Sequence, residues 1–450
     1  MPPDTMAVTF LGTAAGRPST TRNVSSLVVK LDSTLWVFDA GEATQHQFMD
    51  DRCSLSMSRV ARLFITHMHG DHINGLPGLL CTISAGEGGV LPGQDDPRLG
   101  DSRGIPPTEI YGPSGLRLFL RTCLALTQSI LSRPYVVHEL LFPDEPEEVG
   151  ELHPSERRGR SIRADEQGFW RDVVGEAEGG GVSVSAGPIQ HTIRCVGYLL
   201  SESPRPLPIQ PNLYIPHLKS PANAAALAAQ GIKNPLSVLS RLQTSREPVT
   251  LADGTVLRPP DPDPHGGRRV MILGDTFDAR AMLGLVRPAG TSGDAADGEV
   301  DLVVHEATNA YLPTWDESHA PGKQRDGAPV TEASVRALAR EHGHSTPQVA
   351  GEFARLVGAR EVVLNHLSVK YPDPDARGAQ GASDESRAKW RGMLGEIERQ
   401  ADEALRGGPF EDEVEEGGSG GGGARVRTAR DFMTVEVVRR DKRGKKASRQ

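Results

Sequence analysis

Apolar and polar residues alternate along two segments near the start of the chain, and apolar runs return throughout it. Ser26 to Leu31 and Leu35 to Phe38 alternate on either side of Asp32-Ser33-Thr34, which predicts a β-hairpin. The other apolar runs predict strands at 62–65, 109–113, 182–189, 198–200, 270–273, 302–306, 362–366 and 431–438.

Four segments between these strands carry the signals of helices, at 114–128, 222–229, 331–342 and 347–356. Ser114 and Thr331 are suitable N-caps, Pro347 lies near the start of the last helix, and Gly358 lies just past its end. Strands that alternate with helices in this way predict a layered α/β fold.

A dense group of metal-competent side chains follows the strand at 62–65. His67, His69, Asp71 and His72 form an H-x-H-x-D-H array, and a Gly-rich apolar segment follows it. Imidazole and carboxylate groups are the usual ligands of catalytic zinc. On a turn, His67 and His69 project to one side, while Asp71 and His72 face a neighbouring position. The array therefore predicts part of two adjacent metal sites, which suits hydrolysis of phosphate esters.

More candidate ligands stand where later strands end. His191 follows the strand at 182–189, Asp275 follows 270–273, His305 and Glu306 follow an apolar run, and His366 follows another. A lone histidine at a strand end is more often structural, and the array alone could be a His-rich surface loop. Four such positions together with the array favour one shared metal centre.

Taken in order, these motifs resemble those of tRNase Z in its short form, the tRNA 3′-processing endoribonuclease of the metallo-β-lactamase superfamily. The metal array by itself indicates only the superfamily, whereas His-Glu-Ala-Thr and His-Ser-Thr narrow the resemblance to tRNase Z. The matching segments are 10–13, 18–23, 38–45, the array, 75–80, His191 with Gly197-Tyr198, Gly274-Asp275-Thr276, His305-Glu306-Ala307-Thr308, His344-Ser345-Thr346 and Asn365-His366.

The resemblance implies a metallo-β-lactamase αβ/βα four-layer sandwich with an inserted flexible arm. It also implies two Zn²⁺ ions per subunit, with Mn²⁺ or another divalent ion as the alternative. His67, His69 and His191 would hold the first ion, and Asp71, His72 and His366 the second. Asp275 would bridge the two.

The resemblance further assigns catalytic roles. Asp71 would orient or deprotonate the attacking water, and His344, aligned by Glu306, would protonate the leaving oxygen. A carboxylate hydrogen-bonded to an imidazole keeps it protonated and aimed, as general acid catalysis requires. The alternatives are an ion pair at a strand end for Glu306 and a helix cap for His344.

The loop at 18–23 supplies Arg22 and Asn23 as the candidate substrate-binding residues. Thr20 stands where the family loop has Lys, which puts preference for the 3′ end of the substrate in question. Ala40 and Ala43 replace Cys and Gly of the family. All metal-ligand positions are intact, which argues against an inactive paralogue.

The net charge of −9 is concentrated in one place. Residues 143–181 hold 11 acidic residues against five arginines, which predicts a solvated acidic insertion that need not be ordered. Residues 198–260 instead carry six basic and three acidic residues. The Pro-rich segment 201–260 has the place in the order of the family's tRNA-binding arm, so we expect it to grip precursor tRNA; a surface excursion without a partner is the alternative.

The whole chain, 1–450, is expected to form a single domain. Beyond the arm and the acidic insertion, we predict a flexible insertion at 83–108, a low-complexity linker at 408–424 and a basic tail at 439–450. The tail could be a nuclear-import signal, an RNA-binding arm or a solubilising tail. No apolar run is long enough to span a membrane, the N-terminus has no signal-peptide pattern, and four scattered cysteines suit free thiols. An intracellular protein, cytoplasmic and/or nuclear, is expected.

Three functions remain open from the sequence. The first is a zinc-dependent endoribonuclease that cuts precursor tRNA after the acceptor stem, leaves a 3′-hydroxyl and acts as a homodimer. The second is a phosphodiesterase of the same fold acting on small molecules such as cyclic nucleotides. The third is a non-catalytic RNA-binding paralogue, against which the intact ligands with Glu306 and His344 argue.

Overall fold

Two large β-sheets face each other in the computed structural model, which describes residues 2–85, 105–147, 150–245, 247–286, 300–325, 327–407 and 424–439. The first sheet has nine strands in the order β20-β1-β2-β3-β4-β5-β6-β7, with β8 also paired to β6. Its strands are β1 (Met6–Gly12), β2 (Ser26–Leu31), β3 (Thr34–Phe38), β4 (Val60–Phe64), β5 (Thr108–Pro113), β6 (Tyr135–Leu141), β7 (Glu156–Arg157), β8 (Ser161–Arg163) and β20 (Thr434–Glu436).

The second sheet has seven strands in the order β19-β18-β15-β14-β11-β10-β9. They are β9 (Trp170–Val174), β10 (Val182–Ile189), β11 (Cys195–Glu202), β14 (Arg269–Ile272), β15 (Leu302–Glu306), β18 (Glu361–Asn365) and β19 (Arg425–Thr428). Two small hairpins stand apart from both sheets: β12 (Val249–Thr250) with β13 (Val256–Leu257), and β16 (Gln324–Arg325) with β17 (Ala328–Pro329).

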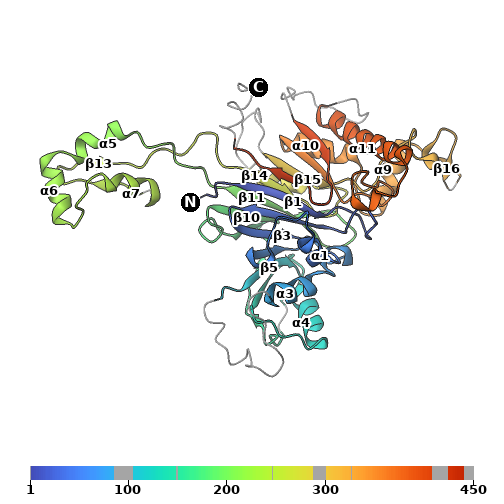
Figure 1. The fold of residues 1–450 in the computed structure, drawn as a ribbon, viewed down its shortest axis with the longest axis horizontal. Coiled ribbons are helices and arrows are strands. Elements are labelled where there is room, and N and C mark those ends of the chain that lie inside the picture. The colour runs from blue at the N-terminus through green and yellow to red at the C-terminus, as the bar shows by residue number, and fades with distance from the viewer. Residues whose placement is uncertain are drawn as a thin grey trace.

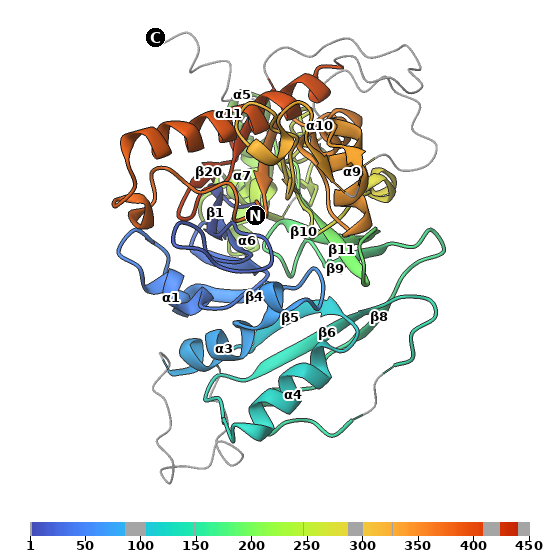
Figure 2. The same cartoon turned by 90° about the vertical axis from the view of Figure 1, so that its right-hand side faces the viewer.

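Helices cover the outer faces of both sheets (Figure 2). Those on the side of the first sheet are α1 (Thr44–Met49), α2 (Gly70–Ile73), α3 (Leu76–Ala85) and α4 (Leu116–Leu126). Those that follow the arm in sequence are α8 (Leu283–Val286), α9 (Glu332–Glu341), α10 (Pro347–Leu356) and α11 (Asp384–Leu405). Short 3₁₀ helices occur at Met57–Arg59, Arg280–Met282, Glu317–His319 and Arg377–Ala379.

Three apolar cores hold these four layers together. The inner faces of the sheets meet around Trp36, Phe64 and Tyr198. A second core packs α10 and α11 onto the second sheet, and a third packs α3 and α4 onto the first. Fully burying one large apolar side chain stabilises by about 1.5–3 kcal/mol, so the alternating strands supply the driving force for the sandwich. The predicted α/β sandwich is confirmed.

The arm projects away from the sandwich on two extended stems (Figure 1). It contains α5 (Pro211–Leu218), α6 (Pro221–Ala229) and α7 (Ser237–Ser245) besides the β12–β13 hairpin. Six buried side chains form a small core of its own: Leu218, Leu227, Val238, Leu242, Leu251 and Leu257. The sequence predicted the helix at 222–229, but it did not predict α5 and α7, because prolines and polar residues obscure their periodicity.

The acidic segment 143–181 differs from the solvated insertion that the sequence predicted. Its described residues form β7, β8 and β9, and Trp170, Val173 and Val174 are buried between the sheets. Exposed Arg171 and Asp172 lie between those apolar positions within β9. Because the segment contains many charged residues, the sequence did not reveal a strand whose inward-facing side chains are apolar.

The predicted flexible insertion 83–108 overlaps ordered elements at both ends, because residues 83–85 finish α3 and Thr108 begins β5. Residues 86–104 of it lie outside the described residues, as do most of the linker 408–424 and the tail after Arg439. Among the described residues, no helix is long and apolar enough to cross a membrane.

Candidate metal centre

The candidate ligands meet because several strands end at the same edge of the sandwich. In the first sheet β4 runs parallel to its neighbours β3 and β5, and the array follows its carboxyl end. In the second sheet β14, β15 and β18 run parallel, and Asp275, Glu306 and His366 lie at or just past their ends. Parallel strands present their carboxyl ends along one edge, which is where α/β proteins gather functional groups.

One group of four side chains contains His67, His69, His191 and Asp275. Nε2 of His67 and Nε2 of His191 each lie 3.1 Å from Nδ1 of His69. Oδ2 of Asp275 lies 3.8 Å from Nε2 of His67 and 3.9 Å from Nε2 of His191. These four atoms surround a common point.

A second group contains Asp71, His72, His366 and the same Asp275. Nε2 of His366 lies 3.2 Å from Oδ2 of Asp71 and 3.3 Å from Oδ2 of Asp275. Nε2 of His72 lies 3.3 Å from Nε2 of His366 and 3.4 Å from Oδ1 of Asp275. Asp275 therefore stands between the two groups with both carboxylate oxygens engaged.

The two groups fit metal ions in chemistry and in spacing. Imidazoles and carboxylates are zinc ligands at distances of about 2.0–2.2 Å, so neighbouring ligands of a tetrahedral ion lie about 3.3 Å apart. Most separations within the two groups lie between 3.1 and 3.4 Å, and Oδ2 of Asp275 stands farther from His67 and His191 of the first group, at 3.8 and 3.9 Å. The arrangement is a metal-binding site shared between two neighbouring ligand groups.

The charge states of the first group suit metal ligation. Burial lowers the pKa of His67, His69 and His191, so these imidazoles are neutral at pH 7 and keep a lone pair for a metal. Burial opposes the ionised form of Asp275, but the charges of His366 and His72 in the second group, with a hydrogen bond from His72, hold the pKa of its carboxyl well below its usual range. Within the first group, an ionised carboxylate thus faces three neutral imidazoles.

A layer of hydrogen bonds behind the ligands fixes their orientation. Asp39 accepts hydrogen bonds from the backbone N–H and hydroxyl of Thr66, and its Oδ2 lies 2.7 Å from Nδ1 of His72. The carbonyl of Gly343 accepts from Nδ1 of His191 at 2.7 Å. Such partners determine which ring nitrogen is left for a metal.

Two of these residues adopt backbone conformations that only strong local constraints maintain. Asp39 has φ 57° and His366 has φ 51°, in the left-handed region that residues other than glycine seldom adopt. Each directly follows a buried strand, so the turn aims its side chain into the centre. Backbone strain of this kind gathers at functional sites.

His344 and Glu306 lie beside the ligand groups. Nδ1 of His344 lies 3.0 Å from Oε1 of Glu306 and 3.9 Å from Oδ2 of Asp275. Burial lowers the pKa of His344, but Glu306 raises it by charge and hydrogen bonding, and the net pKa is about 9. The imidazole is therefore protonated at pH 7 and partly exposed to solvent.

Thr308 links the acid pair to the second ligand group. Its hydroxyl lies 2.6 Å from Oε2 of Glu306 and 3.1 Å from Nδ1 of His366. The sequence predicted no role for Asp39 or Thr308, although both lie within segments that resemble the family's motifs. Their roles depend on contacts between residues far apart in the chain, and no local spacing reports them.

The candidate substrate-binding residues lie in different surroundings from the metal groups. The Arg22 guanidinium is 1% exposed and donates to the carbonyls of Tyr371 and Ala429 and to the Thr13 hydroxyl. The Asn23 amide donates to the carbonyl of Glu42. In this geometry Arg22 supports its loop from behind, and direct contact of either residue with substrate stays a prediction.

Comparisons with known proteins agree with this geometry. A family model described as anti-Pycsar protein Apyc1 matches residues 6–85, the part that contains the array. Zinc phosphodiesterase ELAC protein 1 of Bos taurus is 33% identical over 442 residues, covering 96% of this chain and 98% of that protein. Ribonuclease BN of Cronobacter sakazakii is 33% identical over 371 residues, covering 81% of this chain and 90% of that protein.

Among solved structures, human tRNase Z, short form (ELAC1), superposes with a TM-score of 0.52 at 26% identity, covering 96% of this chain and 100% of that one. The fold and the site define a metal-dependent hydrolase of the metallo-β-lactamase fold. With relatives at this identity over nearly the whole chain, the protein belongs to the tRNase Z family.

Proposed function

We propose that this protein is a zinc-dependent endoribonuclease that processes the 3′ ends of precursor tRNA. It hydrolyses the phosphodiester that follows the acceptor stem and leaves a 3′-hydroxyl on the tRNA. The observation that carries this proposal is the Glu306–His344 pair at 3.0 Å, placed beside two ligand groups that share Asp275. Relatives of matching length that are named zinc phosphodiesterase and ribonuclease support it.

The proposed cofactors are two Zn²⁺ ions per subunit. His67, His69 and His191 would hold one, Asp71, His72 and His366 the other, with Asp275 between them. When bound, the ions would supply Lewis-acid activation of water and neutralise charge on the scissile phosphate.

The chain's own residues supply the proton transfers. Asp71 would orient or deprotonate the attacking water. Burial opposes its ionised form, but the hydrogen bond from His366 and the charge of His72 hold the pKa of its carboxyl below its usual range, and the backbone N–H of Gly16 donates to its Oδ2. As the bond from phosphorus to the 3′ oxygen breaks, protonated His344 donates its proton to that oxygen. Glu306 stays ionised behind it and stabilises the imidazolium before the transfer.

The experiment compares two substrates, a 3′-extended precursor tRNA and bis-p-nitrophenyl phosphate, each with and without a chelator. p-Nitrophenolate leaves readily without a proton, whereas the ribose 3′ oxygen needs one. His344→Ala should therefore lower tRNA cleavage about 10²–10⁴-fold and spare the dye ester. His69→Ala, which removes a ligand, should abolish both reactions.

Each other outcome identifies another function. Chelator-sensitive cleavage of the dye ester without any tRNA cleavage would indicate a small-molecule phosphodiesterase. No metal-dependent cleavage of either substrate would indicate a non-catalytic RNA-binding protein.

We further propose that the enzyme acts as a homodimer in which the arm of one copy serves the metal centre of its partner. Exposed Lys219, Lys233 and Arg258 on the arm suit contact with tRNA phosphates. Light scattering should give about twice the chain mass of 48.3 kDa. Mixing His69→Ala subunits with subunits that lack the arm should restore part of the tRNA cleavage that neither shows alone, and no recovery would contradict an arm that acts across the dimer.

A further inference from the structure

A buried ionic cluster joins the two stems of the arm where they leave the second sheet. Glu202 is the last residue of β11, and Arg268 directly precedes β14. Their side chains are 0% and 3% exposed. Nε and Nη2 of Arg268 each donate to a different oxygen of Glu202 at 2.7 Å, and the backbone N–H of Arg268 donates to the same carboxylate at 3.0 Å.

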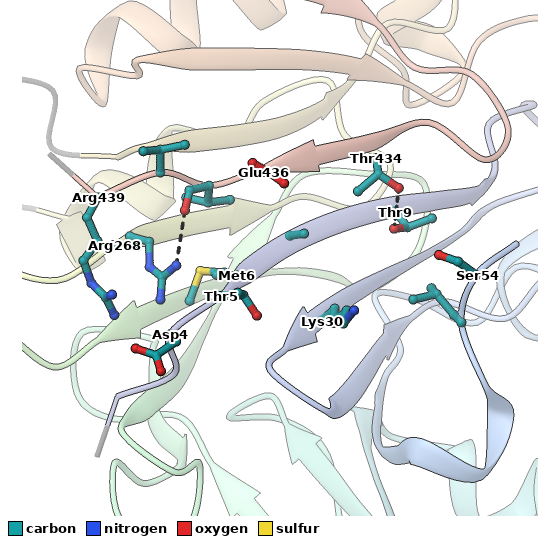
Figure 3. Close-up of a pocket in the computed structure, with 14 residues that line it drawn as sticks. Asp4, Thr5, Met6, Thr9, Lys30, Ser54, Arg268, Thr434, Glu436 and Arg439 are labelled. Carbon is teal, nitrogen blue, oxygen red and sulfur yellow. Dashed lines mark hydrogen bonds between the residues drawn. The ribbon is translucent and has the colours of Figure 1, made fainter. Parts of the chain in front are cut away.

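Segments near both ends of the described chain reach this cluster, and Figure 3 shows Asp4 and Arg439 on the same side as Arg268. Arg268 donates to the carbonyl of Pro3 at 2.6 Å and to that of Val437 at 3.3 Å. Arg439 forms an ion pair with Glu202 and donates to the carbonyl of Pro3. We call Glu202, Arg268 and Arg439, with the carbonyl of Pro3, the arm-root cluster.

The first stem is tied to the N-terminal segment a second time. Arg205 donates to the carbonyl of Pro2 at 2.9 Å and to Asp4 at 2.7 Å. Asp4, Arg268 and Arg439 line one side of a cavity of about 400 Å³ between the arm root and the edge of the first sheet (Figure 3). Four chain segments that are distant in sequence thus converge where the arm begins.

The local backbone is built for this close approach. A Cβ on Gly267 would lie 1.8 Å from the carbonyl oxygen of Glu202, so only glycine fits between the stems. A buried ion pair of this kind adds little net stability over an apolar pair of similar volume, because desolvation offsets the attraction. The bidentate contact between arginine and carboxylate instead fixes the orientation of the two side chains relative to each other.

Beyond the root, a short antiparallel pairing joins the two stems. The stems pair through one bridge, Pro206 with Pro262, and through backbone hydrogen bonds from Leu207 to Asp261 and from Asp263 to Arg205. The arm has its own apolar core and extends away from the sandwich (Figure 1). A small rotation at the root would therefore displace α5–α7 by a large distance.

We propose that the arm-root cluster is a positioning device that fixes the angle between the arm and the catalytic body. This rests on the proposed function, in which the arm and the metal centre grip one tRNA. If the cluster already holds this angle in the free protein, the arm and the metal centre are spaced for a tRNA of fixed length before it binds. Binding then avoids the entropic cost of ordering the arm. Glu202, Arg268 and Arg439 are positioning residues and do not touch the reacting atoms.

The test uses the full chain with zinc and two variants of different severity, Arg439→Met and Glu202→Gln. We expect KM for precursor tRNA to rise about tenfold or more, while kcat/KM for bis-p-nitrophenyl phosphate stays within about twofold of the unaltered protein. Arg439→Met removes the more exposed arginine and leaves the Glu202–Arg268 pair, so it should fold even if Glu202→Gln does not. Arg399→Met, which breaks the ion pairs of Arg399 with Glu396 and Glu403 on α11, is the matched control and should change the kinetics of neither substrate.

Two further readouts separate positioning from general stability. Small-angle X-ray scattering should show a broader range of arm angles in the variants. The double variant should be no worse than the more impaired single variant, because both act through one cluster. Unaltered KM for tRNA, or equal losses on both substrates, would overturn the inference. Failure of the unaltered protein to cut tRNA would instead reject the proposed function.

Discussion

Glu306 controls the proton that His344 carries. Burial alone lowers the pKa of His344, and the charge and hydrogen bond of Glu306 raise it to about 9. The imidazole is protonated below that pKa and loses its proton above it, so acid catalysis is available at neutral pH and disappears as pH rises through the pKa. Glu306→Gln removes the main cause that raises the pKa of His344. We therefore expect the alkaline limb of the pH profile of kcat/KM for precursor tRNA to move to lower pH.

The measurement is a pH profile of tRNA cleavage for the unaltered protein, Glu306→Gln and His344→Ala. Glutamine keeps an oxygen that can accept from the backbone N–H of Thr276, as Glu306 does, so the local fold has a way to persist. The profile of His344→Ala should lack the limb that Glu306→Gln displaces. An unshifted limb in Glu306→Gln would show that Glu306 does not act through His344.

Ala43 stands where the family motif has glycine. Its backbone conformation is one that glycine adopts more easily than alanine. It has φ 61° and ψ 16° just before α1, a left-handed conformation that costs a residue with a Cβ about 1–2 kcal/mol. Glycine avoids this strain but loses more freedom on folding. Ala43→Gly should therefore stabilise the protein by roughly 0.5–1 kcal/mol, measured by denaturant unfolding.

The nearby Ala40→Gly is the matched control. Ala40 is fully buried and is absent from the residues with positive φ, so glycine there removes a packed methyl group and relieves no strain. We expect it to destabilise the protein. Destabilisation by both substitutions would mean that the surroundings of Ala43 depend on its methyl group.

Individual residues also show which features of the site the sequence could predict and which it could not. His67 to His72 could be grouped because they are adjacent in sequence, and His191, Asp275 and His366 because each follows a predicted strand. The motif predicted Arg22 as a substrate contact, which stays a prediction, but it did not predict that the guanidinium is buried and donates to the carbonyls of Tyr371 and Ala429. Burial of a long charged side chain is decided by segments hundreds of residues away.

At the scale of elements, the arm has an apolar core of its own, so we expect that it can be removed without unfolding the sandwich. Leu207 and Asp261 already lie at hairpin distance, because the N–H of Leu207 donates to the carbonyl of Asp261. Replacing 208–260 by Asn-Gly should leave the two sheets and the arm-root cluster intact. We expect kcat/KM for precursor tRNA to fall at least tenfold while hydrolysis of bis-p-nitrophenyl phosphate is unchanged.

A full-length control separates loss of charge from loss of the arm. Changing Lys219, Lys233 and Arg258 together to Gln keeps the arm core, whose residues are apolar. The slope of log KM for tRNA against log salt should then fall by about 2–3, one per lost phosphate contact. If removing the arm impaired both substrates equally, the arm would support the fold and not the tRNA.

Strands and helices were predictable where a single hydrophobic periodicity, of strand or of helix type, runs through the whole segment. The hairpin β2–β3, the strand β10 and the helix α10 lie within a residue of their predicted bounds. The strand β9 was hidden because Trp170, Val173 and Val174 are embedded among acids. The helix α5 contains Pro216, which masks its helical signal, and packing against the small arm core decides its state.

At the scale of the whole molecule, the residues of the proposed metal centre come from both sheets, and the end of the described chain returns to the first sheet. The array comes from the first sheet, and His191, Asp275 and His366 come from the second. β20, from the end of the described chain, completes the first sheet beside β1. Ligands drawn from both sheets mean that bound metal resists their separation, and this could not be read from either half of the sequence alone.

Metal should therefore stabilise the native protein measurably. An ion that binds only the native state adds about 2.7 kcal/mol to the free energy of unfolding when present at about 100 times its Kd. We expect zinc added to chelator-treated protein to raise the Tm by several degrees, measured by calorimetry at fixed pH. The gain should fall as pH drops into the acid range, where His67, His69 and His191 take up protons. It should keep rising above neutral pH, because Asp275 and Asp39 raise the pKa of the buried His72 and zinc must displace that proton.

A pair of histidine variants tests whether the stabilisation acts through the shared centre. His366→Ala removes a ligand that the second sheet contributes, so most of the zinc-dependent rise in Tm from the second ligand group should disappear. His46→Ala removes an exposed imidazole on α1 and should leave the rise unchanged. A full rise in His366→Ala would mean that zinc stabilises the protein from elsewhere. The contact between the sheets would then rest on the apolar core around Trp36, Phe64 and Tyr198 without help from the metal.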